Sequence, residues 1–202
     1  MMCGQRARLS MVLIMGMAKI FYVIGASGSG KDSLIDYVRN NVSSDVTLGF
    51  PIRYITRPVD MKCETHIEVT RDEFQPKMEQ GKFAMNWHSH NTFYGIGQEI
   101  NEMLERGISV VINGSREYLN KACKIYKNLV PILITVDKET LYRRLKTRGR
   151  ESDEQIEKRI QRTSKVDKWI SSREIHLIPN DGTIKQAGTQ LLEFIKQQIK
   201  IV

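Results

Sequence analysis

A glycine-rich run in this chain has the residue types and spacing that bind phosphate. An apolar segment, residues 19–24, leads into Gly25-Ala26-Ser27-Gly28-Ser29-Gly30-Lys31-Asp32-Ser33. Glycines let the backbone fold closely round phosphate oxygens with its N–H groups pointing inward, and the positive end of a helix starting near Gly30 adds to the attraction. Lys31 supplies a mobile charge that reaches terminal phosphates. We therefore predict a strand, a loop and a helix that bind ATP through residues 25–33, in preference to a merely flexible glycine loop.

Asp32 stands where such loops usually carry Ser or Thr, whose hydroxyl binds Mg²⁺. A carboxylate beside a triphosphate is repelled unless a cation lies between them, so we expect Asp32 to hold Mg²⁺ directly or through water. The alternative is an acidic residue that favours the positive end of the helix, which leaves that repulsion unexplained. Ser33 is the second candidate metal ligand, although one residue along a helix is a rotation of about 100°.

A second informative stretch is rich in arginine. Five cations fall between Arg143 and Arg150, Gly149 ends the helix that carries them, and Arg159 projects from the next helix. Arginines on both sides of such a hinge can close on a phosphoryl group during its transfer. We expect Arg144, Arg148 and Arg159, together with Lys31, to be the catalytic residues. The alternative is a solvated basic helix face.

Composition bounds the class of protein. A chain of 202 residues is long enough for one well-buried α/β domain with a small insertion or lid. The net charge of +8 suits nucleic acid, a membrane surface or a small polyanionic substrate. The basic residues gather around the arginine-rich stretch instead of forming an aromatic-studded stripe, so we expect no nucleic acid and no membrane as partners. The odd number of cysteines, three, without metal spacing indicates free thiols in a reducing compartment.

The N-terminus imitates a signal peptide, because Arg6 and Arg8 precede an apolar run over residues 11–18. Lys19 ends that run, and the strand that follows is needed to position the phosphate loop. The segment is also too short to span a bilayer. We therefore expect a cytoplasmic protein, and a start at Met17 would make residues 1–16 a dispensable extension.

Alternating strands and helices predict an α/β fold with a five-stranded parallel sheet flanked by helices. The expected strands are residues 19–24, 52–55, 108–112, 129–136 and 174–178, and the expected helices are residues 31–40, 72–80, 98–106, 115–127, 138–147, 152–170 and 184–200. We expect one domain over residues 17–202. Residues about 57–95 would form an acceptor-binding insertion, and residues about 143–160 the lid.

The segment Arg53-Tyr54-Ile55-Thr56-Arg57-Pro58 ends one expected strand at the edge of the sheet where open α/β folds bind ligands. Arg57 there suits a phosphate of the second substrate. The aromatic and polar run over residues 83–95 is suited to line a pocket. Its histidines and His66 lack convincing metal spacing, so we interpret them as hydrogen-bonding or surface residues.

The chain resembles the guanylate-kinase-like branch of the P-loop kinases over about residues 17–200. The resemblance rests on the glycine-rich loop, T-R-P at 56–58, F-Y-G at 93–95, R-R-L-x-x-R-G-x-E at 143–151, K-R-I at 158–160 and N-D-G at 180–182. It implies a P-loop core, a nucleoside-monophosphate-binding insertion and an arginine lid. Met85 stands where guanylate kinases have a base-reading glutamate, no arginine follows at 59–61, and Asn113-Gly114-Ser115-Arg116 replaces an acidic stretch. Such a site is not expected to select guanine.

Those replacements, with G-K-D-S, I-T-R-P, F-Y-G-I-G, V-I-N-G-S-R and R-G-R-E, closely resemble the ribose 1,5-bisphosphate phosphokinases, a family associated with phosphonate breakdown. The resemblance implies transfer of phosphate from ATP, with Mg²⁺, to the anomeric phosphate of ribose 1,5-bisphosphate. It also implies that Arg57, Tyr94, Asn113 and Arg116 bind the acceptor and that the Asn180-Asp181 turn lies near adenine.

Two rival functions stay open at this point. One is a kinase of the same class that phosphorylates GMP or dGMP. The other is an inactive guanylate-kinase-like binding module, against which the intact Lys31 and lid arginines argue.

Overall fold

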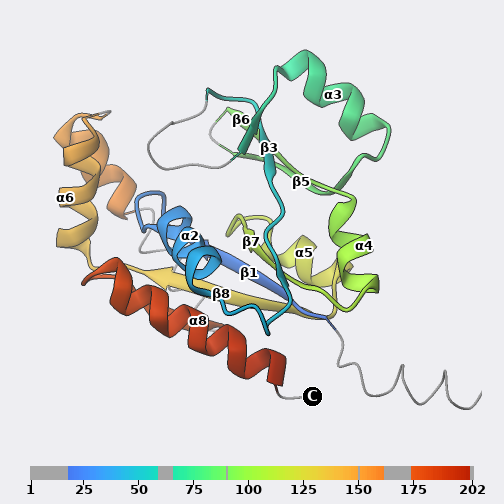
Figure 1. Cartoon of the computed structure of the whole chain (residues 1–202). Coiled ribbons are helices and arrows are strands. Elements are labelled where there is room, and N and C mark those ends of the chain that lie inside the picture. Colours follow the sequence, from blue (N-terminus) through green and yellow to red (C-terminus); the bar gives the residue numbers. More distant parts are fainter. Residues whose placement is uncertain (1–17, 59–65, 90, 150, 162–173, 201–202) are drawn as a thin grey trace, which may run out of the picture.

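A computed structural model describes residues 18–58, 66–89, 91–149, 151–161 and 174–200 of the chain. Within these residues, two sheets and their helices form the fold shown in Figure 1. No helix of the described residues is long and apolar enough to cross a membrane. The predicted extension, residues 1–16, lies outside them, as do Cys3 and Cys63, whereas Cys123 forms no disulfide with a described residue.

The larger sheet has five parallel strands in the order β2-β7-β1-β8-β9, which confirms the predicted parallel sheet. Its strands are β1 (Ile20–Gly25), β2 (Leu48–Gly49), β7 (Ser109–Asn113), β8 (Leu129–Thr135) and β9 (His176–Pro179). Side chains 20–24 of the central strand are fully buried. A near-continuous apolar run is typical of a parallel strand that is covered on both faces.

Helices cover both faces of this sheet (Figure 1). On one face, α2 (Lys31–Asn41) and α8 (Ile184–Lys200) pack around Phe21 and Val23. On the other face, α4 (Glu99–Glu105) and α5 (Leu119–Ile125) pack around Tyr22 and Ile24. The expected helix 115–127 is shorter than predicted at both ends, and residues 114–118 form loop and turn beside the site.

The second sheet has four strands in the order β4-β3-β6-β5. They are β3 (Arg53–Ile55), β4 (His66–Glu68), β5 (Phe83–Ser89) and β6 (Thr92–Gly97), and α3 (Arg71–Glu79) packs on them. The expected strand 52–55 is therefore real, but its placement in the parallel sheet is wrong. The parallel sheet uses the two-residue β2 instead, which is too short to show a hydrophobic pattern. Weak periodicity over residues 57–95 concealed the other three strands, because this sheet is short and partly exposed.

The predicted lid, residues about 143–160, falls on α6 (Lys138–Arg148) and the helix after it, and we call these two helices the lid helices. The first of them, α6, ends at Gly149 with φ 64°, as predicted. Residues 153–161 are helical, and the remainder of the expected helix 152–170 lies outside the described residues. Ile156 and Ile160 of this second lid helix pack with Leu141 and Leu145 of α6. The two lid helices and Ala26 of the glycine-rich loop therefore share a small apolar core.

Candidate active site

The glycine-rich loop joins β1 to α2 at the carboxyl end of the parallel strands. Gly30 has φ 87°, and a Cβ added there would lie 2.5 Å from Nδ2 of Asn180. Gly28 has φ 96°, and a Cβ added there would lie 3.0 Å from Leu141 of the lid. The positive φ favours glycine at both positions, and at Gly30 a side chain would also meet Asn180. The loop is held from behind by the last strand and from the side by the lid.

Lys31 folds back over this loop. Its Nζ donates hydrogen bonds to the carbonyl oxygens of Gly25, at 3.0 Å, and Ala26, at 2.9 Å. Burial is the main cause that lowers the pKa of the Lys31 ammonium from 10.5 to about 8. The carboxylate of Asp32 opposes that change, while the guanidiniums of Arg116 and two other arginines add to it. The lysine thus lies among positive charges, a setting that favours an anionic ligand.

Asp32 is fixed by two neighbours from different parts of the fold. Nη2 of Arg53, on β3, lies 2.7 Å from Oδ1 of Asp32, and Nδ2 of Asn113, at the end of β7, donates to the same oxygen at 2.6 Å. Oδ2 accepts no hydrogen bond from a described residue. The positive charge that Asp32 needs beside a phosphate is therefore supplied in part by the protein itself, an explanation that sequence reasoning missed.

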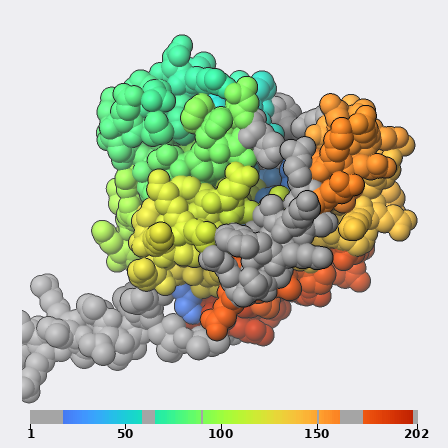
Figure 2. Space-filling model, turned by 180° about the vertical axis from the view of Figure 1, so that it is seen from behind, coloured from blue at the N-terminus to red at the C-terminus, as the bar shows by residue number. Residues whose placement is uncertain are grey.

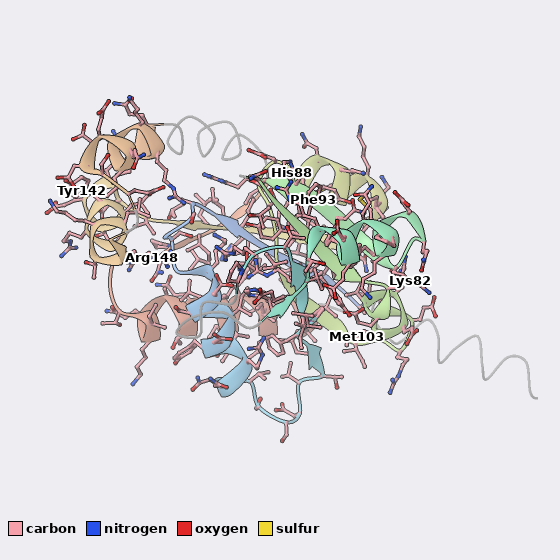
Figure 3. The ribbon with its side chains drawn as sticks, turned by 90° about the horizontal axis from the view of Figure 1, so that it is seen from above. Lys82, His88, Phe93, Met103, Tyr142 and Arg148 are labelled. Carbon is pink, nitrogen blue, oxygen red and sulfur yellow. The ribbon has the colours of Figure 1, made fainter. Side chains whose placement is uncertain are left out.

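A cavity of about 200 Å³ opens in front of the loop. It brings together most of the predicted site residues, namely Gly25, Ser27, Gly28, Gly30, Lys31, Asp32, Ser33, Arg57, Tyr94, Asn113, Arg116 and Arg148. These come from both sheets and from the lid. In Figure 2 the second sheet with α3, in green, and the lid helices, in orange, rise on opposite sides of the core. Figure 3 shows Arg148 on the lid side and His88 and Phe93 on the other.

Five predicted residues lie outside the lining of this cavity, around the loop and lid: Ala26, Ser29, Arg144, Arg159 and Asn180. Asn180 is fully buried, and its Nδ2 donates to the carbonyl oxygen of Ser29 at 2.7 Å. Nη1 of Arg144 is buried, lies near Gly30 and finds no hydrogen-bond partner among the described residues. Asn180 and Arg144 thus lie against the back of the loop. Direct contact of Asn180 with adenine stays a prediction.

Arg159, another of the five, forms an ion pair within the lid. Its Nη1 lies 2.6 Å from each carboxylate oxygen of Glu151, and both side chains are 29% exposed. Lys146 of α6 and Asp153 form a more exposed pair, at 3.2 Å, across the Gly149 turn. With the apolar contacts described above, these pairs join the two lid helices. The catalytic role of Arg159 stays a prediction.

Aromatic side chains form one wall of the cavity. The rings of Trp87 and Tyr94, paired across β5 and β6, are parallel with centroids 5.4 Å apart, and both line the cavity with Ser89. Met85 lies on the same strand face, fully buried in the core, and does not line the cavity. Neither Trp87 nor Ser89 carries a carboxylate, so this wall has no acidic side chain that could accept hydrogen bonds from a guanine base.

A buried tyrosine supports the loop after β7. The hydroxyl of Tyr22 donates to the carbonyl oxygen of Ser115, at 3.3 Å, and accepts from its backbone N–H, at 3.0 Å. A Cβ added at Gly114 would lie 2.1 Å from the Tyr22 ring. These contacts fix the start of the loop that carries Arg116.

Comparison with known proteins agrees with this geometry. The sequence model of the guanylate kinase family matches residues 17–198. "Ribose 1,5-bisphosphate phosphokinase PhnN" of Psychromonas ingrahamii is 49% identical over 185 residues, 91% of this chain and 93% of that protein. The protein of the same name from Thiobacillus denitrificans is 44% identical over 181 residues, 90% of this chain and 94% of that protein. The chain belongs to the PhnN family of guanylate-kinase-like kinases.

A solved structure supports the fold. The crystal structure of guanylate kinase from Anaplasma phagocytophilum matches with a TM-score of 0.70 and 14% identity, over 91% of this chain and 88% of that one. The predicted P-loop kinase fold and the predicted family are thus confirmed. At 14% identity this match shows the fold alone.

The donor set of this PhnN-family site fits Mg²⁺ brought by ATP. Oδ2 of Asp32 and the hydroxyl of Ser33 are hard oxygen donors on residues that line the cavity beside the loop. No group of three or more His, Cys, Asp or Glu side chains suited to a metal occurs among the described residues. Mg²⁺ commonly takes one or two protein oxygens and completes its shell with phosphates and water. The residues present therefore suit that ion.

Sequence reasoning expected the run over residues 83–95 to line a pocket, and Trp87, Ser89 and Tyr94 of that run do line the cavity. It assigned no role to four other lining residues, namely Arg53, Gly114, Ser115 and Glu117. Arg53 carried a usable signal, because it lies four residues before Arg57 and has the same charge. Its partner, however, is Asp32, 21 residues away in the chain. Only the placement of the second sheet over α2 brings the two together.

Proposed function

We propose that this kinase transfers the terminal phosphoryl group of ATP to the anomeric phosphate of ribose 1,5-bisphosphate, giving 5-phosphoribosyl 1-diphosphate in phosphonate breakdown. The proposal follows the name of its relatives in Psychromonas ingrahamii and Thiobacillus denitrificans. The observation in the chain itself that carries it is the charge of the cavity. Five cationic side chains, Lys31, Arg53, Arg57, Arg116 and Arg148, line it against two acidic ones, Asp32 and Glu117.

Such a lining suits two phosphorylated substrates that meet in one cavity. The walls offer guanidiniums, which bind phosphate oxygens by paired hydrogen bonds. The aromatic wall of Trp87 and Tyr94 offers one hydroxyl and no carboxylate for reading a base. A small sugar with two phosphates therefore fits the cavity better than a guanine nucleotide.

In the proposed reaction an oxygen of the acceptor phosphate attacks the γ-phosphorus of ATP. A new P–O bond forms, the bond from the γ-phosphorus to the β–γ bridging oxygen breaks, and ADP leaves. The attacking oxygen is already anionic, so the site needs no general base. Alignment and neutralisation of charge supply the rate enhancement.

The residues divide this work. The loop over residues 25–31 and the Lys31 ammonium hold the ATP phosphates, and Arg57, Arg116 and Tyr94 hold the acceptor. The lid arginines Arg144, Arg148 and Arg159 stabilise the charge of the transferring group. Mg²⁺, held through Asp32 or Ser33, supplies neutralisation of the β- and γ-phosphate oxygens when it is bound.

The test is identification of the product. The purified chain, MgATP and ribose 1,5-bisphosphate are incubated, and the products are followed by mass spectrometry and ³¹P NMR. We expect a sugar diphosphate with ADP in equal amount, and no product with the Lys31→Met variant. ATP consumption that does not depend on ribose 1,5-bisphosphate would refute the proposal.

A further inference from the structure

We infer that Arg53 is a second acceptor-binding guanidinium, beside Arg57, and that Asp32 is the residue that orients it. This inference rests on the proposed function and adds a specificity residue to the same site. Neither the sequence motifs nor the relatives' names assign Arg53 a role.

Position is the first argument. Arg53 is on β3, its side chain is only 11% exposed, and it lines the cavity with Arg57 and Arg116. A guanidinium carries five N–H donors in a planar fork. Asp32 engages one nitrogen, Nη2, and the side chain makes no other hydrogen bond with a described residue. The guanidinium of Arg53 therefore keeps N–H groups that can donate hydrogen bonds to a phosphate in the cavity.

Orientation is the second argument. Oδ1 of Asp32 binds Arg53 at 2.7 Å and Asn113 at 2.6 Å, so three elements, α2, β3 and β7, meet at one oxygen. An arginine side chain loses much rotational freedom when it is held, and this loss weakens ligand binding unless the protein has fixed the side chain beforehand. The pair fixes Arg53 before any ligand arrives.

Coupling of the two half-sites is the third argument. Asp32 directly follows Lys31 in the ATP loop, whereas Arg53 belongs to the second sheet, which faces the acceptor side. The charge of Arg53 also contributes to the field at the Lys31 ammonium. The pair thus joins the ATP loop to the acceptor wall by an ion pair that is partly shielded from water.

The chain offers a matched control. Arg39 of α2 pairs with Asp36 at 2.5 Å and lies outside the main cavity, beside a small hollow on the far side of the Asp32–Arg53 pair. The Arg39→Met variant removes the same charge and also breaks an ion pair of α2. It leaves the lining of the main cavity intact.

The experiment compares Arg53→Met, Arg53→Lys, Asp32→Asn, Arg53→Met/Asp32→Asn and Arg39→Met with the wild type. The readouts are kcat, the KM values for ribose 1,5-bisphosphate and ATP, and the Kd of ribose 1,5-bisphosphate by calorimetry at saturating MgADP. We expect Arg53→Met to raise the KM and Kd of the acceptor about 10- to 100-fold, the range of a lost charge-assisted hydrogen bond. The KM for ATP should change less than about threefold, and Arg53→Lys should recover part of the loss.

The double variant tests the orienting role of Asp32. We expect Asp32→Asn to raise the KM and Kd of the acceptor. We expect Arg53→Met/Asp32→Asn to raise them no further than Arg53→Met does, because residues that act as a unit are not additive. In Arg53→Met the carboxylate of Asp32 loses its guanidinium partner, which can destabilise the fold. The double variant removes this carboxylate as well, so it controls for such a folding defect. Arg39→Met should match the wild type.

Three outcomes overturn the inference: an unchanged acceptor KM and Kd in Arg53→Met, equal loss in Arg39→Met, or strictly additive effects in the double variant. If the wild-type chain binds ribose 1,5-bisphosphate without turning it over, only the proposed function is refuted. The Kd values of wild type and Arg53→Met then still test whether Arg53 binds the acceptor. A wild-type chain that does not bind it refutes both.

Discussion

Arg159 and Glu151 form a tight pair inside the lid, in which Nη1 of the arginine lies 2.6 Å from each carboxylate oxygen. An arginine predicted to act on the transferring phosphate is thus held by a partner within the lid. If it acts on phosphate, Arg159→Met should lower kcat about 100-fold, the lower part of the range for one charge donor at a transition state. Glu151→Gln keeps a hydrogen-bond acceptor and should lower kcat less than about tenfold. Equal losses in the two variants, measured by steady-state kinetics, would mean that Arg159 only ties the lid together.

Arg148 lines the cavity from the end of α6, so Arg148→Ala should lower kcat about 100-fold or more without unfolding the chain. Lys146→Ala on the same helix is the control, since Lys146 is 59% exposed and pairs with Asp153 away from the cavity. It should leave turnover within about twofold. Near-normal turnover in Arg148→Ala, with circular dichroism like the wild type, would remove the lid arginines from the mechanism.

Lys31 links activity to stability through pH. Its pKa is about 8 in the folded chain, against an ordinary lysine value of 10.5, so between these values the unfolded chain holds more protons. The free energy of unfolding then rises with pH. Below pH 8 the buried charge opposes folding. Urea titrations of wild type and Lys31→Met should show their difference shifting in favour of the wild type from pH 8 to about 10. A difference in the free energy of unfolding that does not depend on pH would contradict the lowered pKa. In a separate kinetic assay, the turnover of Lys31→Met should fall about 100-fold or more.

Tyr22 should matter for the site although it does not line the cavity. Tyr22→Phe keeps the ring and removes both hydrogen bonds to Ser115, so we expect roughly 1–2 kcal/mol lower stability and a higher KM for the acceptor, held in part by Arg116. Gly114→Ala should be more severe, because its Cβ would lie 2.1 Å from the Tyr22 ring. Thermal melts and acceptor KM values check both. A Tyr22→Phe enzyme with wild-type KM would show that the loop needs no such support.

Much of this site could be predicted because its signals are local. The loop from Gly25 to Lys31 is evident from its glycine spacing after an apolar strand, and the turn at Gly149 from its place after a charged helix. Arg53 could not be assigned in the same way. Its strand belongs to a second sheet with weak periodicity, and its contact with Asp32 depends on how that sheet sits over α2.

Met85 illustrates a different limit. The resemblance identified the position as the place of a missing base-reading acid, and the structure shows that it is a fully buried core residue. An apolar residue at this position can either remain in the site without binding the base or pack into the core. The sequence alone does not distinguish these two cases, because the residue is apolar in both. The residues of the same face of β5 that line the cavity are Trp87 and Ser89.

The central claim is that the cavity accepts a sugar bisphosphate and not a guanine nucleotide. The most direct measurement is a competition in one tube, with MgATP and equal concentrations of ribose 1,5-bisphosphate and GMP, each product followed by mass spectrometry. Their ratio gives the ratio of kcat/KM values. We predict that 5-phosphoribosyl 1-diphosphate forms at least about 10³-fold faster than GDP, as expected where a base meets no paired polar groups. GDP formed at an equal or greater rate would contradict the account.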